Sequence, residues 1–109
     1  APGIEMMYSY FGEKTALLPR LEPQVARTVI GTSTAAAMHA GAHFGYRGMV
    51  REIFREIVRE TGDPSLKLLA TGGFAAQVME GFEEPVTLMP TLTLEGLALA
   101  RAFDLKEEV

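Results

Sequence analysis

Two adjacent glycines, Gly72 and Gly73, follow an apolar run and precede a segment with helical character. Residues 68–70 are typical of a short buried strand, and residues 74–79 are typical of the start of a helix. A strand that turns into a helix through two glycines brings main chain without Cβ atoms to the end of a sheet, where a flat ligand can lie directly on it. The same pattern occurs in turns that carry glycine only for tight geometry. A ligand platform and a structural turn are therefore the two interpretations of this segment.

Two hydroxyl residues, Ser33 and Thr34, stand where a long helix is expected to begin. A hydroxyl at that place satisfies one of the free N–H groups of the first turn. The start of a helix with free N–H groups and two hydroxyls also suits an anionic or hydroxyl-bearing ligand. Local chemistry leaves two interpretations of Ser33 and Thr34 open: a helix cap alone, or a helix cap that also binds a ligand.

His39 and His43 lie four residues apart on the same expected helix, so both could face one metal ion. The metalloprotease arrangement needs a glutamate directly after the first histidine, and Ala40 stands there instead. No third ligand is evident nearby in the sequence. We therefore expect two partly exposed or hydrogen-bonded histidines, with a metal site as a remote alternative.

Three glycines, Gly41, Gly45 and Gly48, lie on or near one face of that helix. Glycine is a poor helix former, at a cost of about 1 kcal/mol relative to alanine. Three in one stretch indicate the close approach of another helix or backbone, from this chain or from a second copy of it.

The elements that must position these residues form an α/β pattern. Helices are predicted over residues 4–17, from a cap at Ser33 or Thr34 to Thr61, over residues 74–80, and from Thr91 or Thr93 to Phe103. Strands are predicted over residues 66–70 and 86–88, with a short strand or extended segment over residues 28–30, and the charged tail 104–109 is expected to fray. The long helix carries a stripe that is expected to be buried, made of Tyr46, Met49, Val50, Ile53, Phe54, Ile57 and Val58.

Composition narrows the function classes. The chain has 109 residues, 48% of them hydrophobic and 22% charged, which predicts one globular domain. It has no cysteine, so disulfides and thiolate metal sites are excluded and a reducing compartment is compatible. A net charge of −4 argues against binding to nucleic acid or to an anionic membrane. No apolar run approaches the ~20 residues of a membrane span, and the first residues lack a signal-peptide pattern, so we expect a cytoplasmic protein.

Five motifs, taken in order, resemble the C-terminal half of the type III pantothenate kinases. The resemblance covers roughly residues 1–103. The motifs are Pro2-Gly3, Ala16-Leu17-Leu18-Pro19-Arg20-Leu21, Ile30-Gly31-x-Ser33-Thr34-x-x-Ala37-Met38-x-x-Gly41-x-x-x-Gly45-Tyr46-x-Gly48, Ala70-Thr71-Gly72-Gly73-Phe74-Ala75 and Leu92-Thr93-Leu94-Glu95-Gly96-Leu97.

The resemblance implies a fold and an activity. The implied fold is part of one ribonuclease-H-like lobe of the acetate and sugar kinase, Hsp70 and actin superfamily, in which ATP lies between two lobes. The implied activity is phosphorylation of pantothenate, the first step of coenzyme A biosynthesis. It implies a divalent cation (Mg), a monovalent cation (K or ammonium), and a homodimer with the pantothenate pocket near the subunit contact.

The resemblance also implies roles for particular residues. Thr34 matches the family threonine that contacts pantothenate. Thr71, Gly72 and Gly73 match the segment on which adenine and ribose rest. The helix with Gly41, Gly45 and Gly48 resembles the family's dimer-forming helix.

The family's phosphate-transfer groups have no counterpart in this chain. The Asp-x-Gly-Asn phosphate loop, the Gly-Ala-Asp-Arg segment that holds the base, and the Thr-rich phosphate loop belong to the other half of these kinases. Phosphoryl transfer needs positioned charge at the γ-phosphate and an oriented nucleophile. We therefore expect residues 1–109 to be a single partial domain with no catalytic residue and no activity alone. It would be a fragment, a cleaved portion or one partner of a split kinase, since its start resembles the inside of a turn. A non-catalytic interaction or dimerisation module is the alternative.

Overall fold

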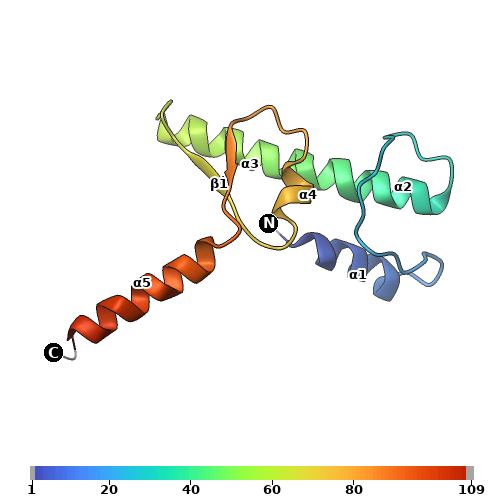
Figure 1. Ribbon diagram of the computed structural model, residues 1–109. Coiled ribbons are helices and arrows are strands. Elements are labelled where there is room, and N and C mark those ends of the chain that lie inside the picture. The colour runs from blue at the N-terminus through green and yellow to red at the C-terminus, as the bar shows by residue number, and fades with distance from the viewer. Residues whose placement is uncertain (1, 108–109) are drawn as a thin grey trace. The chain divides into compact units, whose positions relative to one another are not determined.

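The computed structural model describes residues 2–107, which form two compact units (Figure 1). The first unit spans Ala1–Leu66 and the second spans Lys67–Val109. The described part of the first unit contains helices, and the second combines two helices with a small parallel sheet. This mixture confirms the predicted α/β class. The single partial domain over residues 1–109 stays a prediction.

Helix α1 (Ile4–Lys14) is shorter than predicted. It ends before Thr15, which has an extended backbone and donates its hydroxyl to the Phe11 carbonyl, a group left free at the helix end. The helix passes through Gly12 without a break. A Cβ at Gly12 would lie 2.7 Å from Arg20 Cγ, so the glycine makes room for the returning loop.

Residues 34–61 form one continuous helical run, as predicted. It consists of α2 (Thr34–Ala40), a π-helical segment η1 (Gly41–Gly45) and α3 (Tyr46–Thr61). Ser33 is the cap: its Oγ accepts the Ala36 N–H at 3.2 Å. Gly62 ends the run in the left-handed conformation, with φ 62°, and donates its N–H to the Val58 carbonyl at 3.0 Å.

The π-segment was not predicted from the sequence, and the core of the first unit lies against it. Helix α1 packs on η1, where Ala42 and His43 are 1% and 3% exposed. Ile4 and Tyr8 are the buried residues of α1. A π-turn holds more residues than an α-turn, so it offsets the faces of the flanking helices.

The apolar stripe on α3 is not buried as predicted. None of the residues of α3 is fully buried, and Ile53 and Ile57 are 41% and 42% exposed. The spacing correctly predicted the helix, but burial also requires a body against the stripe. In the first unit α1 packs on η1, and the stripe lies on α3, which follows η1 in the chain.

Residues 28–30 do not form the strand that was one interpretation of them. The structure assigns no strand to this segment, and Val29 and Ile30 are 68% and 79% exposed. β-branched residues fit a pleated surface only where a neighbouring strand supplies the pairing.

The second unit is built on two parallel strands, β1 (Leu68–Ala70) and β2 (Val86–Leu88), which confirm the predicted strands with a shorter first one. Leu68 pairs with Val86 and Ala70 with Leu88. Helix α4 (Ala75–Met79) connects the strands, as parallel pairing requires a crossover.

Helix α5 (Leu92–Glu107) follows β2 and extends beyond its predicted end. The expectation of a fraying tail is wrong for residues 104–107, which are helical, and residues 108–109 lie outside the described part. Lys106 in the last turn is favourable at the negative end of the helix dipole. Of the two predicted caps, Thr91 precedes the helix, and its hydroxyl donates to Glu95 Oε1 at 2.6 Å.

We predict that Gly31→Ala destabilises the first unit. A Cβ at Gly31 would lie 2.4 Å from both Cα and N of Ala37, which are backbone atoms of α2 that cannot move aside alone. Overpacking of this kind costs about 1–3 kcal/mol. Urea unfolding of the chain measures the change in free energy of unfolding.

The matched control is Gly96→Ala, because a Cβ there meets no atom within 4 Å and alanine favours a helix. Gly96→Ala is expected to be neutral or stabilising. Equal stability of the Gly31→Ala variant and the unchanged chain would contradict the close approach of this loop to α2.

Candidate functional site

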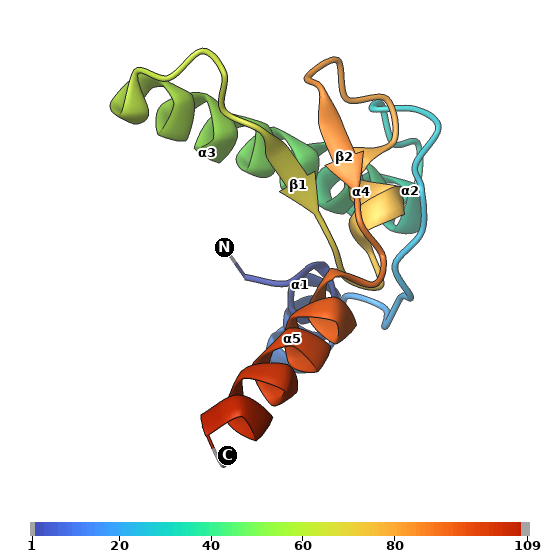
Figure 2. The ribbon, with the colours of Figure 1, turned by 60° about the vertical axis from the view of Figure 1, so that its left-hand side comes forward.

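A hollow of about 420 Å³ lies at the carboxyl edge of the two strands in the second unit. Both strands run in the same direction, so the turns that follow them leave the sheet at one edge (Figure 2). The lining residues are Ala70, Thr71, Gly72, Gly73, Ala75, Ala76, Leu88, Pro90 and Thr93. A crevice outside the carboxyl ends of parallel strands is where open α/β sheets bind ligands.

The predicted platform forms one wall of this hollow. The structure brings Thr71, Gly72 and Gly73 together, and all three are exposed rather than sealed within packed side chains. Gly72 has a φ of 105°, a backbone conformation that residues with a side chain rarely adopt. A Cβ at Gly72 or Gly73 would meet no atom within 4 Å. The main chain is therefore open to a ligand from this side.

The second wall was missed by reasoning from the sequence. Leu88 and Pro90 come from the end of β2 and the turn after it, and Thr93 comes from the first turn of α5. The signal that could have found them is the pair of predicted strands. If the strands are parallel neighbours, whatever follows residues 86–88 must lie beside the two glycines.

The lining of the hollow is neutral. Its side chains are alanine, leucine, proline and two threonines, so hydrogen bonds from side chains can come only from Thr71 and Thr93. A hollow with this lining suits the flat, uncharged part of a ligand. It offers no lysine or arginine to a phosphate and no carboxylate to a divalent cation.

Thr34 belongs to the first unit and lies at the first helical position of α2, where it is exposed. Ser33 next to it performs the capping. Ser33 is therefore the cap, and the ligand-binding role of Thr34 stays a prediction.

The two histidines are buried on one side of the long helical run. The Tyr8 hydroxyl forms a hydrogen bond of 3.0 Å with His39 Nδ1, and His43 Nε2 lies 3.3 Å from Arg47 Nη1. Arginine can only donate, so Nε2 of His43 is the acceptor. Among the described residues no group of three histidine, aspartate or glutamate side chains is placed to hold a metal ion. His39 thus links α1 to the helical run through Tyr8, and His43 pairs with Arg47 within that run.

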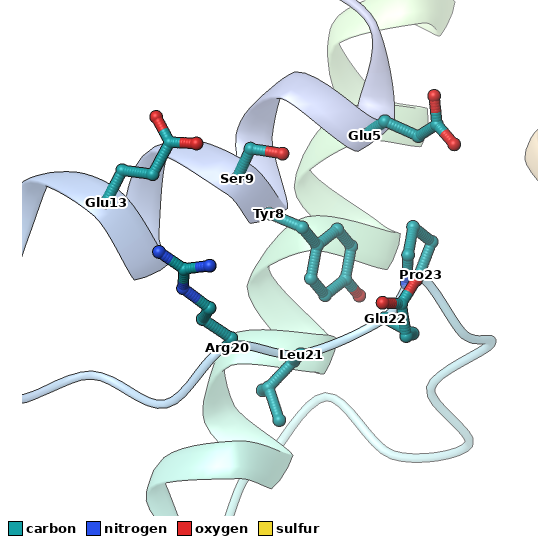
Figure 3. A pocket seen from close by; sticks show the side chains of 8 residues that line it. All are labelled: Glu5, Tyr8, Ser9, Glu13, Arg20, Leu21, Glu22 and Pro23. Atoms are coloured by element: carbon teal, nitrogen blue, oxygen red, sulfur yellow. The ribbon is translucent and has the colours of Figure 1, made fainter.

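A second hollow, of about 230 Å³, lies between α1 and residues 20–23 in the first unit (Figure 3). Glu5, Glu13 and Glu22 contribute carboxylates around it, together with the guanidinium of Arg20. Tyr8 forms its buried wall, and the hydroxyl of that residue is already bound to His39. The hollow therefore presents no buried polar group that awaits a ligand, and we assign it to the packing of α1.

The three helix glycines face open space. A Cβ at Gly41, Gly45 or Gly48 would meet no atom within 4 Å in the part of the chain that the structure describes. The close approach that these glycines predict is therefore not made by α1, the helix that packs on η1. A second copy of the chain stays the prediction for what covers them.

Two parallel strands joined by a helix, with an open glycine turn at their carboxyl edge, define an α/β protein. The family model of the type III pantothenate kinases matches residues 1–56. This chain belongs to that family.

Relatives with this name match over nearly the whole chain. The protein from Akkermansia muciniphila is 44% identical over 106 residues, which are 96% of this chain and 43% of that protein. One from Dehalococcoides mccartyi is 41% identical over 91% of this chain and 38% of its own length. One from Pelagibacter ubique is 32% identical over 92% of this chain and 40% of its own length. The chain thus spans about two fifths of the relatives it matches. The comparisons support the family resemblance, and which half of the kinase the chain represents stays a prediction.

No helix among residues 2–107 has both the length and the apolar character to cross a membrane.

We predict an alkaline loss of stability that depends on Tyr8. Burial raises the pKa of the Tyr8 hydroxyl above its ordinary value of 10.0, against a smaller lowering by a backbone hydrogen bond with Gln24. A group whose pKa is raised in the folded state contributes its stability in full below the unfolded pKa and loses it as pH rises through the folded pKa. The free energy of unfolding should therefore fall from about pH 10 upward, as measured by urea unfolding at stepped pH.

Tyr8→Phe should flatten this alkaline fall. Tyr10→Phe is the control, since Tyr10 is 59% exposed on the same helix. An alkaline fall of equal size in the Tyr8→Phe variant would contradict the assignment to Tyr8.

Proposed function

We propose that this chain is a portion of an ATP-dependent pantothenate kinase, the enzyme that phosphorylates pantothenate in the first step of coenzyme A biosynthesis. The observation that carries the proposal is the open Gly72–Gly73 main chain beside a neutral hollow, in a member of the type III pantothenate kinase family. The portion supplies the adenosine platform at Thr71, Gly72 and Gly73. Its Thr34 contributes to the pantothenate pocket. We place the enzyme in the cytoplasm.

The chemistry of the hollow supports a division of tasks. A nucleoside is flat, largely uncharged and rich in hydroxyl groups, which fits glycine main chain, small apolar side chains and two threonines. The triphosphate, the magnesium ion and the potassium or ammonium ion need charged or oxygen ligands that this lining lacks. We assign them to the remaining portion of the kinase, whether on the same chain or on a separate one.

The exposed apolar surface of the second unit supports a missing partner. Leu94, Leu97 and Phe103 on α5 are 66%, 63% and 66% exposed. A parallel sheet is normally covered on both faces and extended by further strands, whereas this one has two strands of three residues. The remaining three fifths of the kinase would supply the layers that these surfaces need. Without them we expect no catalysis, since this sequence has no counterpart of the phosphate-transfer motifs that the family resemblance implies.

A homodimer through the helix from Gly41 to Gly48 completes the proposal. Bare glycine on an exposed helix face lets a second helix approach closely, and the described chain leaves that face open. The same face favours the alternative, a non-catalytic dimerisation module related to the kinases. The two are discriminated by nucleotide: the kinase portion responds to ATP and the module does not.

We predict that ATP and pantothenate stabilise the chain only in the presence of the complementary portion of a type III pantothenate kinase. The region of the Akkermansia muciniphila relative outside the match provides that portion. A thermal shift of several degrees is expected for the mixture with ATP, magnesium and pantothenate, because ligands that bind the folded state stabilise it by mass action.

The controls for this experiment are the chain alone and the complementary portion alone with the same ligands. No ligand-dependent shift in the mixture would count against the kinase proposal, and an ATP-independent dimer of the chain would then favour the interaction module.

We predict that Gly45→Leu abolishes the dimer and leaves the fold intact. Within the described chain a side chain has room at this position, and leucine favours a helix over glycine by somewhat under 1 kcal/mol. A loss of dimer in sedimentation equilibrium can then be attributed to the blocked approach of the second copy. Gly96→Leu is the matched control, because Gly96 is also a helical glycine with open space. An unchanged dimer in the Gly45→Leu variant would exclude this face as the interface.

A further inference from the structure

The wall of the hollow that follows β2 carries its own polar group. Leu88 and Pro90 give this wall an apolar surface, and Thr93 gives it a hydroxyl. The wall follows β2 in the same way that the glycine turn follows β1, since Ala70 and Leu88 are paired in register. The two turns therefore border the same hollow, and Thr93 belongs to the part of its lining that follows β2.

The hydroxyls near the start of α5 have different environments. The Thr91 hydroxyl is used within the helix start, since it donates to Glu95 Oε1 at 2.6 Å. Thr93, two residues later, is exposed and lines the hollow. A threonine hydroxyl can donate one hydrogen bond and accept two, so it can serve either a donor or an acceptor of the ligand.

We propose that Thr93 is a nucleoside-binding residue, which forms a hydrogen bond to the sugar or base of ATP from the wall that follows β2. This inference rests on the proposed function. Thr71 and Thr93 are the only side chains in the lining that can form hydrogen bonds, so side-chain recognition of the nucleoside depends on these two hydroxyls. Pro90 covers the apolar face of the ligand beside Thr93.

Thr93→Val tests the hydroxyl without changing the shape of the side chain. The kinase reconstituted from this chain and the complementary portion of the Akkermansia muciniphila relative is assayed for KM of ATP, KM of pantothenate and kcat. Loss of one hydrogen bond should raise the KM of ATP about three- to tenfold. The lost contact concerns only the nucleoside, so the KM of pantothenate and kcat should change less than about twofold. The reconstituted pair should sediment as before.

Two variants serve as controls. Thr93→Ser keeps the hydroxyl and should restore the KM of ATP. Thr87→Val makes the same chemical change at an exposed position of β2 that is not part of the lining, and it should leave the KM of ATP unchanged. A rise with Thr93→Val that Thr93→Ser does not reverse would overturn the hydrogen bond, because the shape of the site would then be the cause.

The assay with 2′-deoxyATP distinguishes the partner of the hydroxyl. If the effect of Thr93→Val disappears with this nucleotide, the hydroxyl contacts the 2′-hydroxyl of ribose. If it persists, the contact is to the base or to another part of the sugar, and either result supports the proposal. An active pair in which Thr93→Val leaves the KM of ATP unchanged would overturn the inference and leave the proposed function standing. A pair without any response to nucleotide would contradict the proposed function, and the role of Thr93 with it.

Discussion

The parallel pairing of β1 with β2 is the constraint on which the candidate site depends. Three register pairs, from Leu68 with Val86 to Ala70 with Leu88, hold the strands side by side in the same direction. The Met89 N–H donates to the Ala70 carbonyl at 2.8 Å, and this hydrogen bond joins the ends of the two strands. Beyond it the glycine turn and the proline turn diverge toward α4 and α5. The hollow is the space between them, so neither wall exists without the pairing.

The sequence predicted the elements of this site better than their assembly. The two glycines after an apolar run were sufficient to predict a turn with bare main chain, because no other residue gives the φ of 105° found at Gly72 so readily. The position of Thr93 at the hollow was not predicted, because it depends on which strands are neighbours. The sequences of two three-residue strands do not contain that information. The π-segment was not predicted for a similar reason: nothing in residues 41–45 alone indicates it, and the wider turn accompanies the packing of α1 against η1, in which Ala42 and His43 are buried.

Burial is the other property that the pattern could not predict. The stripe on α3 and the leucines of α5 have the spacing of buried residues, yet Ile57 and Leu97 are 42% and 63% exposed. The spacing of apolar residues indicates which helix faces are suited to burial. The structure shows which of these faces the described residues bury. The large side chains of α5 lie on two sides of the helix, since Leu94 and Leu97 are separated by about half a turn from Leu99 and Phe103. A helix that is apolar on two sides is typical of one enclosed between layers rather than one lying on a surface.

A nucleoside and the phosphates attached to it need different surroundings, and the hollow of the second unit offers only the neutral kind. A charge near the apolar wall of Leu88 and Pro90 would lose hydration without gaining a counter-ion, whereas the phosphates and their cations need a dense set of donors and carboxylates. If the proposed assignment holds, this chain contributes shape and hydroxyl contacts, and the complementary portion contributes charge. Binding energy from the nucleoside then positions a phosphate that the second unit itself does not touch. A small error in this hollow would therefore weaken nucleotide binding first, and it would leave the chemistry of the bound complex largely intact.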